Sequence, residues 1–242
     1  IQVLLDGTVW LLTENDGAIR VVTLPEKNYT TKPEIYSTKS GLFPADHFYQ
    51  VYQDRAGNNW LLTDNGLGMI RPGEWQPVNY FVETQGKQDG MNQAFYAVRE
   101  CEDDICFTSD RGRIWCYQKK SGEFRLHELP TKARITSIHA VGNDNTVVTT
   151  DSDGFFLSNL KTNKHIHYSP VTCKELSDQP ILSAYVDRTS EVWFEQEEPG
   201  VVVHFNPATG VVKREQMRVE YSNADRSRPA FHIHEDIHGH VW

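Results

Sequence analysis

Short apolar runs separated by polar turns fill residues 41–70, which read GLFPADHFYQVYQDRAGNNWLLTDNGLGMI. Two runs rich in aromatic and β-branched residues flank the segment Asp54-Arg55-Ala56-Gly57-Asn58. A second polar turn, Asp64-Asn65-Gly66, follows the run Trp60-Leu61-Leu62-Thr63. Short runs bounded by Gly, Asn and Asp are typical of β-strands. The pattern therefore predicts three strands joined by two tight turns.

Weaker copies of this pattern recur along the chain at a nearly constant spacing. The positions equivalent to Trp60 are Trp10, Ile105, Val147, Trp193 and Trp242, with spacings of 50, 45, 42, 46 and 49 residues. A period of this size, with several short strands and no helical stretch, is typical of a four-stranded propeller blade. One such sheet cannot bury both of its faces, so it must stack on its neighbours. We therefore expect an all-β fold, a partial β-propeller of about five four-stranded antiparallel blades plus the start of another.

The repeats divide the chain into blades at residues 1–40, 41–88, 89–131, 132–178 and 179–225, and residues 226–242 begin the next blade. In the first blade we expect strands at residues 3–6, 9–13, 19–23 and 35–38, with a polar loop at 25–33. The outer strand of the second blade is expected at residues 79–82. Ile1 is no initiator Met and Trp242 falls inside a repeat, so we expect a single propeller segment truncated at both ends.

The composition of the chain limits the kinds of molecule that it is expected to bind. The formal net charge is −9, with 33 acidic and 24 basic residues. Phosphate binding needs a basic surface, so we expect no nucleic-acid partner. No apolar run approaches the ~20 residues of a membrane helix, so we expect membrane attachment only through parts of a parent protein outside this chain.

The motif G-L-x-P-x-D-x-x-x-x-V-x-x-D-x-x-G-N-x-W-L-x-T-x-x-G-L, at residues 41–67, resembles the two-component regulator propeller repeat. The likeness is close around Trp60, partial at Trp10 and Trp242, and looser in the other copies. The resemblance implies a periplasmic sensor domain of a bacterial hybrid two-component system. Such a sensor recognises a glycan-derived oligosaccharide, works as a homodimer through its ectodomain, and signals to a cytoplasmic histidine kinase.

Propeller geometry indicates where a ligand would bind. The loops that join consecutive blades share one face with the turns between the second and third strands of each blade. The Asp-x-x-Gly turns Asp54–Gly57 and Asp236–Gly239 lie on the opposite face. We expect a structural role there, because Asp caps a turn and Gly supplies a positive φ. Trp10, Trp60 and Trp193 are expected to fill space between blades.

The loop face gathers ten candidate ligand-binding residues. They are Asp46, His47, Asn92, Asp110, Arg111, Arg113, Arg134, Arg226, Arg228 and His232. Arg forks suit carboxylate and sulfate groups, so the predicted oligosaccharides include acidic ones. Phe48, Tyr49 and Tyr96 are the nearest aromatic side chains for a sugar ring, although strand alternation could bury them. The alternative is that the charged residues are ordinary solvated loop residues.

The chain contains no complete motif of known catalytic mechanism. It lacks a Gly-x-Ser-x-Gly elbow and a phosphate-binding Gly-rich loop. Its His-Glu-x-x-His string, at residues 234–238, lies in a repeat that predicts strands, whereas that zinc motif requires a helix. No spacing singles out the carboxylate pair needed for glycoside cleavage. We therefore expect no enzymatic activity and no cofactor in this chain. Two alternatives stay open: a protein-interaction or dimerisation scaffold, and a polysaccharide lyase or hydrolase propeller.

Three further motifs have two readings each. The histidines of HIHEDIHGH, residues 232–240, suit zinc or copper or are ordinary channel-lining side chains, and we expect no metal. Residues 151–154 (DSDG) resemble part of a calcium loop, but Thr149 replaces its first Asp, which favours a turn equivalent to residues 14–17.

The pairs Cys101/Cys106 and Cys106/Cys116 each flank a hairpin turn. They are either small buried hydrophobic residues or a disulfide, which an exported compartment would permit.

Overall fold

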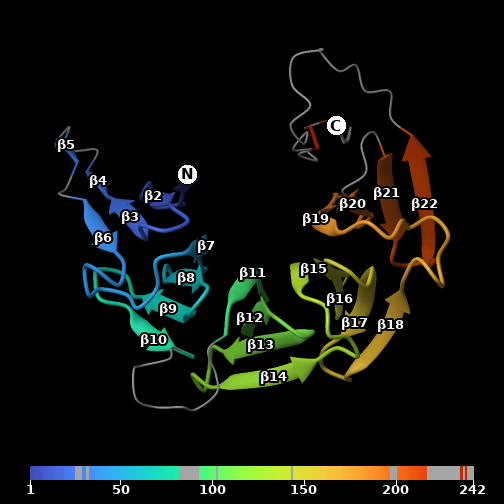
Figure 1. Cartoon of the computed structure of the whole chain (residues 1–242), viewed down its shortest axis with the longest axis horizontal. Helices are drawn as coiled ribbons and strands as arrows, with labels where there is room; N and C mark the ends of the chain where they lie inside the picture. The colour runs from blue at the N-terminus through green and yellow to red at the C-terminus, as the bar shows by residue number, and fades with distance from the viewer. Residues whose placement is uncertain are drawn as a thin grey trace. The chain divides into compact units, whose positions relative to one another are not determined.

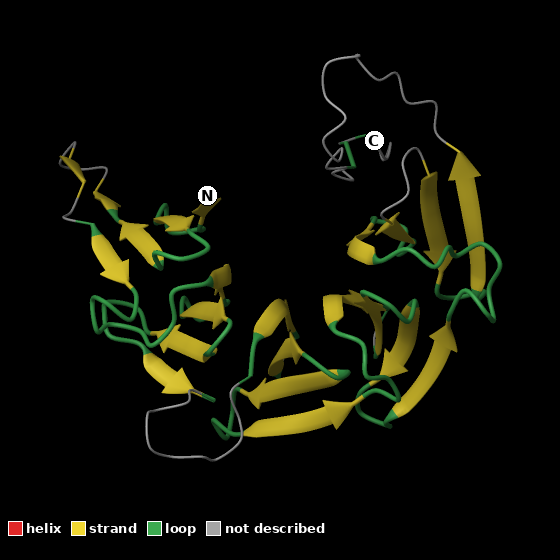
Figure 2. Cartoon of the chain, in the orientation of Figure 1, coloured by secondary structure: helices red, strands yellow, loops and turns green. Residues whose placement is uncertain are grey.

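All regular structure in the described part of the chain is β-structure. The structure is a computed structural model that describes residues 1–24, 29–30, 33–81, 93–101, 103–142, 144–196, 201–216, 235–236 and 238. Within these residues, five four-stranded antiparallel sheets follow one another along the sequence (Figures 1 and 2). In each four-stranded sheet, strands that follow one another in the chain are hydrogen-bonded neighbours, apart from the β4–β5 insertion in the first. The predicted all-β fold of four-stranded propeller blades is confirmed.

Each blade is defined by its strands. The first blade holds β1 (Gln2–Val3), β2 (Val9–Leu12), β3 (Ala18–Val21) and β6 (Glu34–Tyr36). The second holds β7 (Phe48–Gln53), β8 (Asn59–Thr63), β9 (Gly66–Ile70) and β10 (Val78–Tyr80). The third holds β11 (Phe95–Glu100), β12 (Asp104–Ser109), β13 (Arg113–Gln118) and β14 (Phe124–Glu128). The fourth holds β15 (Ile135–Val141), β16 (Asn145–Thr150), β17 (Phe155–Asn159) and β18 (Lys164–Tyr168). The fifth holds β19 (Ile181–Val186), β20 (Val192–Gln196), β21 (Val201–Asn206) and β22 (Val211–Gln216).

The chain divides into two compact units, Ile1–Glu100 and Cys101–Trp242, each with its own core. In the first unit, Trp10 and Trp60 are fully buried, and the ring of Trp10 lies 5.2 Å from that of Tyr36. In the second unit, Phe155 of the fourth blade contacts Phe194 and Phe205 of the fifth, with ring centroids 4.6 and 4.9 Å apart. The fourth and fifth blades thus bury their aromatic faces against each other.

The turns between the second and third strands repeat one hydrogen-bond pattern. In the first blade, the backbone N–H and hydroxyl of Thr13 donate to Gly17 O, at 3.1 and 2.7 Å. In the fourth blade, the same two groups of Thr150 donate to Gly154 O, at 2.9 and 2.8 Å. Both glycines have a positive φ, of 87° and 64°. The equivalence of residues 151–154 with residues 14–17 is confirmed.

Three strand predictions are wrong. The strand expected at residues 3–6 lies at β1 instead, because residues 4–8 form a turn in which Leu4 N donates to Thr8 O at 2.9 Å and Gly7 N donates to Leu4 O at 3.0 Å. The loop expected at residues 25–33 contains a strand, because β5 (Tyr29–Thr30) pairs with β4 (Thr23–Leu24) in a small hairpin. The outer strand expected at residues 79–82 is displaced to β10. It ends at Tyr80 because Phe81 has a φ of 57°, which no strand residue adopts. The residues expected to begin a sixth blade, 226–242, lie outside the described residues except for Glu235, Asp236 and His238.

One of the two possible cysteine pairs is a disulfide. Cys106 of β12 and Cys116 of β13 lie directly opposite each other and are bridged, with both side chains buried. Cys101 and Cys173 take part in no disulfide among the described residues. The reading of Cys106 and Cys116 as simple buried hydrophobic residues is therefore wrong, because antiparallel pairing brings their Cβ atoms side by side.

Candidate functional site

The loop face predicted from propeller geometry is held together by backbone hydrogen bonds. In each case an N–H of the turn between the second and third strands donates to a carbonyl of a connection between blades, either the one that enters the same blade or the one that leaves it. In the first unit these bonds are Gly17 N to Asp46 O (2.9 Å), Asp64 N to His47 O (3.2 Å) and Gly66 N to Gln93 O (2.9 Å). In the second unit they are Gly112 N to Ala133 O (3.0 Å) and Asp151 N to Arg134 O (3.1 Å). The two sets of loops therefore share one face in both units, as predicted.

Three of the six described candidates, Asp46, Arg113 and Arg134, bond to side chains or backbone of the protein itself. The carboxylate of Asp46 accepts hydrogen bonds from the backbone N–H and the hydroxyl of Thr38. Arg113 pairs with Glu128 through its Nε, 3.1 Å from Oε1. The Nε of Arg134 lies 3.4 Å from Asp151 Oδ2. These contacts tie the loops to their own blade.

The remaining charged candidates do not form a described cluster. Arg111 is exposed, with a φ of 59°, in the turn between β12 and β13, and Asp110 is half-buried beside it. Asn92, Arg226, Arg228 and His232 lie outside the described residues. The proposed basic surface therefore has no described counterpart beyond the arginines of the third blade and its connection.

Two of the aromatic candidates and His47 lie in contact with one another, whereas the charged candidates form no such cluster. Phe48 is buried, whereas Tyr49 next to it is 36% exposed. The ring centroid of Tyr49 lies 4.4 Å from that of His47 and 4.9 Å from that of Tyr96. The expectation that alternation could bury all three aromatic residues is wrong for Tyr49. We call His47, Tyr49 and Tyr96 the aromatic platform.

The Asp-x-x-Gly turns are structural, as predicted. Asp54 is buried and accepts from Ala56 N (3.0 Å), Asn58 N (2.8 Å) and the indole N–H of Trp60 (2.9 Å). Gly57 completes the turn with a φ of 84°. Of the equivalent turn at Asp236–Gly239, the structure describes Asp236 and His238, whose N–H donates to the Asp236 carboxylate at 2.8 Å.

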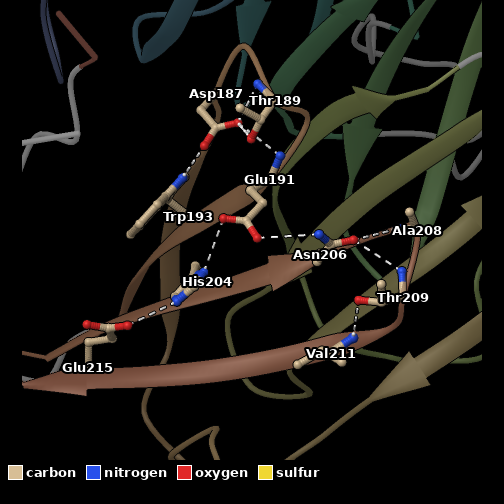
Figure 3. Close-up of polar contacts among 10 residues, drawn as sticks. All are labelled: Asp187, Thr189, Glu191, Trp193, His204, Asn206, Ala208, Thr209, Val211 and Glu215. Atoms are coloured by element: carbon tan, nitrogen blue, oxygen red, sulfur yellow. Dashed lines mark hydrogen bonds and ion pairs between the residues drawn. The ribbon is translucent and has the colours of Figure 1, made fainter. Parts of the chain in front are cut away.

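The fifth blade contains a third turn of this kind, without the glycine, which sequence reasoning missed (Figure 3). Asp187 accepts from Thr189 N (2.8 Å), Glu191 N (3.0 Å) and the indole N–H of Trp193 (2.8 Å). Burial raises the pKa of Asp187, but the hydrogen bonds from Trp193 and Thr189 outweigh it, so the pKa lies below its ordinary value. The spacing Asp-x5-Trp, shared by Asp54 and Asp187, is the signal that could have found it.

A glutamate of the following repeat closes two of these turns. Glu100 accepts from the Tyr52 hydroxyl (2.8 Å) and from Arg55 N. In the second unit, Glu235 accepts likewise from the Tyr185 hydroxyl (3.3 Å) and from Arg188 N (3.1 Å). Burial and the Glu100 carboxylate raise the pKa of Tyr52. The repeated string Tyr-x-Asp-Arg, at residues 52–55 and 185–188, marks these contacts in the sequence.

A buried histidine lies next to the Asp187 turn (Figure 3). The ring of His204 stacks on Trp193 with centroids 4.6 Å apart. Its two ring nitrogens each lie 3.4 Å from a carboxylate, Glu191 on one side and Glu215 on the other. Because these residues come from β21, β22 and the start of β20, the network joins the outer strands of the fifth blade. Sequence reasoning missed it, since nothing in the pattern marks His204 as buried.

The described residues contain no group of three or more His, Cys, Asp or Glu side chains placed to hold a metal ion. The ring of His167 stacks on Phe156 at 4.3 Å, and His165 Nδ1 lies 3.1 Å from the Ser158 hydroxyl. Of the histidines at residues 232–240, only His238 is described. The described part of the chain contains no apolar helix of membrane-spanning length.

Known proteins resemble this chain in structure rather than in sequence. No protein-family model matches the chain, and no curated protein matches it in sequence. Virginiamycin B lyase from Staphylococcus aureus is similar with a TM-score of 0.67 at 16% identity, over 90% of this chain and 69% of the lyase.

Sensor ectodomains are also similar. The extracellular domains of the hybrid two-component systems BT4673 and BT3049 from B. thetaiotaomicron give TM-scores of 0.63 and 0.62, at 16% and 19% identity. The similarity covers 98% and 83% of this chain, but only 37% and 27% of those domains. Together with the five described blades, these likenesses define the fold class as that of propeller-type domains.

Proposed function

We propose that this chain belongs to the ligand-sensing propeller of a hybrid two-component sensor, which recognises a glycan-derived oligosaccharide and signals to a cytoplasmic histidine kinase. The observation that carries the proposal is the repeat motif of residues 41–67, which folds as the second blade and resembles that sensor family. The fold likeness to two ectodomains of hybrid two-component systems supports it.

The disulfide supports the proposed periplasmic location. Bridges persist in oxidising compartments, and thiols stay reduced in the cytosol. Cys106 and Cys116 are bridged between two paired strands in the interior of a blade. The location is thus favoured by a feature independent of the repeat motif.

The proposal also covers assembly. The chain would be one segment of a longer propeller protein, and the sensor would act as a homodimer through its ectodomain. A ligand that prefers one arrangement of the paired sensors would bias the kinase, because a ligand shifts an equilibrium only by its differential affinity for the two states.

A lyase is the second candidate function, favoured by the fold likeness to virginiamycin B lyase. The described residues of the loop face favour binding over chemistry. Asp46, the carboxylate nearest the aromatic platform in sequence, is held by two hydrogen bonds from Thr38. A carboxylate held in this way caps a loop.

Ligand-dependent stabilisation of the full-length protein tests the proposal. We expect one class among neutral, uronic-acid and sulfated oligosaccharides to raise the unfolding midpoint without being consumed. At a hundred times its Kd, a ligand adds about 2.7 kcal/mol to the free energy of unfolding. Release of new reducing ends or unsaturated products would instead indicate a hydrolase or lyase. If no sugar of the panel shifts the midpoint, the sensor proposal is contradicted and an interaction scaffold is favoured.

A further inference from the structure

The first strand of the second blade contains a bulge that turns one aromatic side chain outward. In the pairing of β7 with β8, Phe48 lies opposite Thr63 and Gln50 lies opposite Leu62, so Tyr49 is the extra residue. Phe48 is 4% exposed and Tyr49 is 36% exposed. Bulges redirect a side chain and are frequent beside binding sites.

The next blade repeats the same residue pair. β11 begins with Phe95 and Tyr96, as β7 begins with Phe48 and Tyr49. Phe95 is fully buried, and Tyr96 is half-buried with its ring 4.9 Å from that of Tyr49. In both strands the phenylalanine belongs to the blade interior, and the tyrosine is more accessible. His47, which precedes β7, extends the row of rings.

The blades of the second unit keep the bulge but change the side chain. The extra residue is Thr136 in β15 and Leu182 in β19. Thr136 donates a hydrogen bond to Ile181 O at 2.7 Å, and Leu182 is 47% exposed. The bulge therefore forms around a tyrosine, a threonine or a leucine. The bulge itself does not require an aromatic ring, so the tyrosine in β7 suits a role in binding.

We propose that the aromatic platform binds the apolar face of a pyranose ring in a neutral oligosaccharide, an inference that rests on the proposed sensor function. The rings of His47 and Tyr96 are tilted by 35° and 57° to the ring of Tyr49, so they flank it without being coplanar, and the partly exposed ring of Tyr49 is the one offered to the C–H groups of a sugar. The phenol hydroxyls and the imidazole nitrogens donate to and accept from the sugar hydroxyls around the edge.

Charge favours a neutral ligand over an acidic one. The charged residue next to the platform in the sequence, Asp46, is acidic and offers no cation to a uronate or sulfate group. The chain as a whole has a formal net charge of −9, which also disfavours an anionic ligand.

Binding of neutral gluco-, xylo- and manno-oligosaccharides to the full-length protein, measured by titration calorimetry, tests the platform. Tyr49→Ala and Tyr96→Ala are each expected to weaken the Kd by about tenfold, the equivalent of about 1.4 kcal/mol lost from a stacked ring. Tyr49→Phe keeps the ring and is expected to stay within about threefold of the wild type. Leu182→Ala, at the same bulge position of another blade, is the matched control and should leave the Kd unchanged. Equal unfolding midpoints of the variants establish that each is folded.

Three results would overturn the inference. If a neutral oligosaccharide binds and both alanine variants bind it as the wild type does, the platform is wrong and the sensor proposal stands. If only acidic oligosaccharides bind, the charge argument fails and the platform fails with it. If no oligosaccharide of either kind binds, the proposed function itself is contradicted.

Discussion

Replacing Asp54 by alanine is expected to lower the free energy of unfolding by about 3–5 kcal/mol, a loss characteristic of breaking a buried hydrogen-bond network. The carboxylate accepts from two backbone N–H groups, from the Asn58 amide and from the Trp60 indole. Hydrogen bonds to a charged group contribute about 1.5–3 kcal/mol each, and their sum is not additive. Trp60 is fully buried, so its N–H would lose its partner without access to water. Urea unfolding of the variant and the wild type measures the loss.

Asp6→Ala is the matched control at the equivalent turn of the first blade. Asp6 is exposed and accepts one backbone bond, from Thr8 N at 2.9 Å, besides side-chain hydrogen bonds with Thr8 and Gln53, but none from a tryptophan. Only four positions separate Asp6 from Trp10, against six between Asp54 and Trp60. The Trp10 indole N–H is buried with no hydrogen-bond partner among the described residues. Asp6→Ala should therefore cost about 1 kcal/mol, and equal losses at both aspartates would contradict a role for the indole bond.

Gly154→Ala is expected to lower the free energy of unfolding by about 3–5 kcal/mol, through backbone strain plus overpacking. Gly154 has a φ of 64°, which alone disfavours a side chain. A Cβ there would lie 2.1 Å from the carbonyl oxygen of Tyr168, so the end of β18 would have to move. The shift in the urea midpoint measures the combined effect.

Gly142→Ala, in the same blade, is the control that separates the cost of backbone strain from the cost of the steric clash expected in Gly154→Ala. Gly142 has nearly the same φ, 66°, but a Cβ built on it meets nothing within 4 Å. We expect a loss of about 1–2 kcal/mol there, the cost of the left-handed conformation. Should the two variants lose the same stability, the close approach of the turn to the outer strand would not matter to the fold.

The fold could be predicted from the sequence because each blade repeats a local pattern. The strands β2 and β3 lie within two residues of the bounds expected from their apolar runs and turn residues, 9–13 and 19–23. Strand formation here depends on alternation and turn chemistry, which are local properties. The predicted strand bounds were wrong where the backbone conformation of one residue departed from the extended conformation that its apolar run predicts, as at Phe81.

The candidate site could be predicted only in part. Propeller geometry correctly placed the connections and the turns on one face, because that follows from strand order. It could not reveal that Arg113 and Arg134 form ion pairs with Glu128 and Asp151. Such pairs depend on register between strands and on loop conformation, which the pattern does not specify.

The exposure of Tyr49 could not be predicted because it depends on a bulge. In a regular strand, Phe48 and Tyr49 point to opposite faces, and the pattern does not say which ring meets solvent. One extra residue in β7 changes the direction of the chain at this point. β11 shows the same arrangement, with Phe95 fully buried beside the more accessible Tyr96. A Phe-Tyr pair repeated at the start of successive blades could therefore indicate an exposed tyrosine in other sequences.

Ligand-dependent phosphorylation of the full-length protein in membrane vesicles tests the central claim most directly. With ATP present, an oligosaccharide that binds the wild type is expected to change the phosphate incorporated on the kinase histidine. Tyr49→Ala should require about tenfold more of the same sugar for the same change. Phosphorylation that stays the same with and without a sugar shown to bind would contradict the assignment of this chain to a glycan sensor.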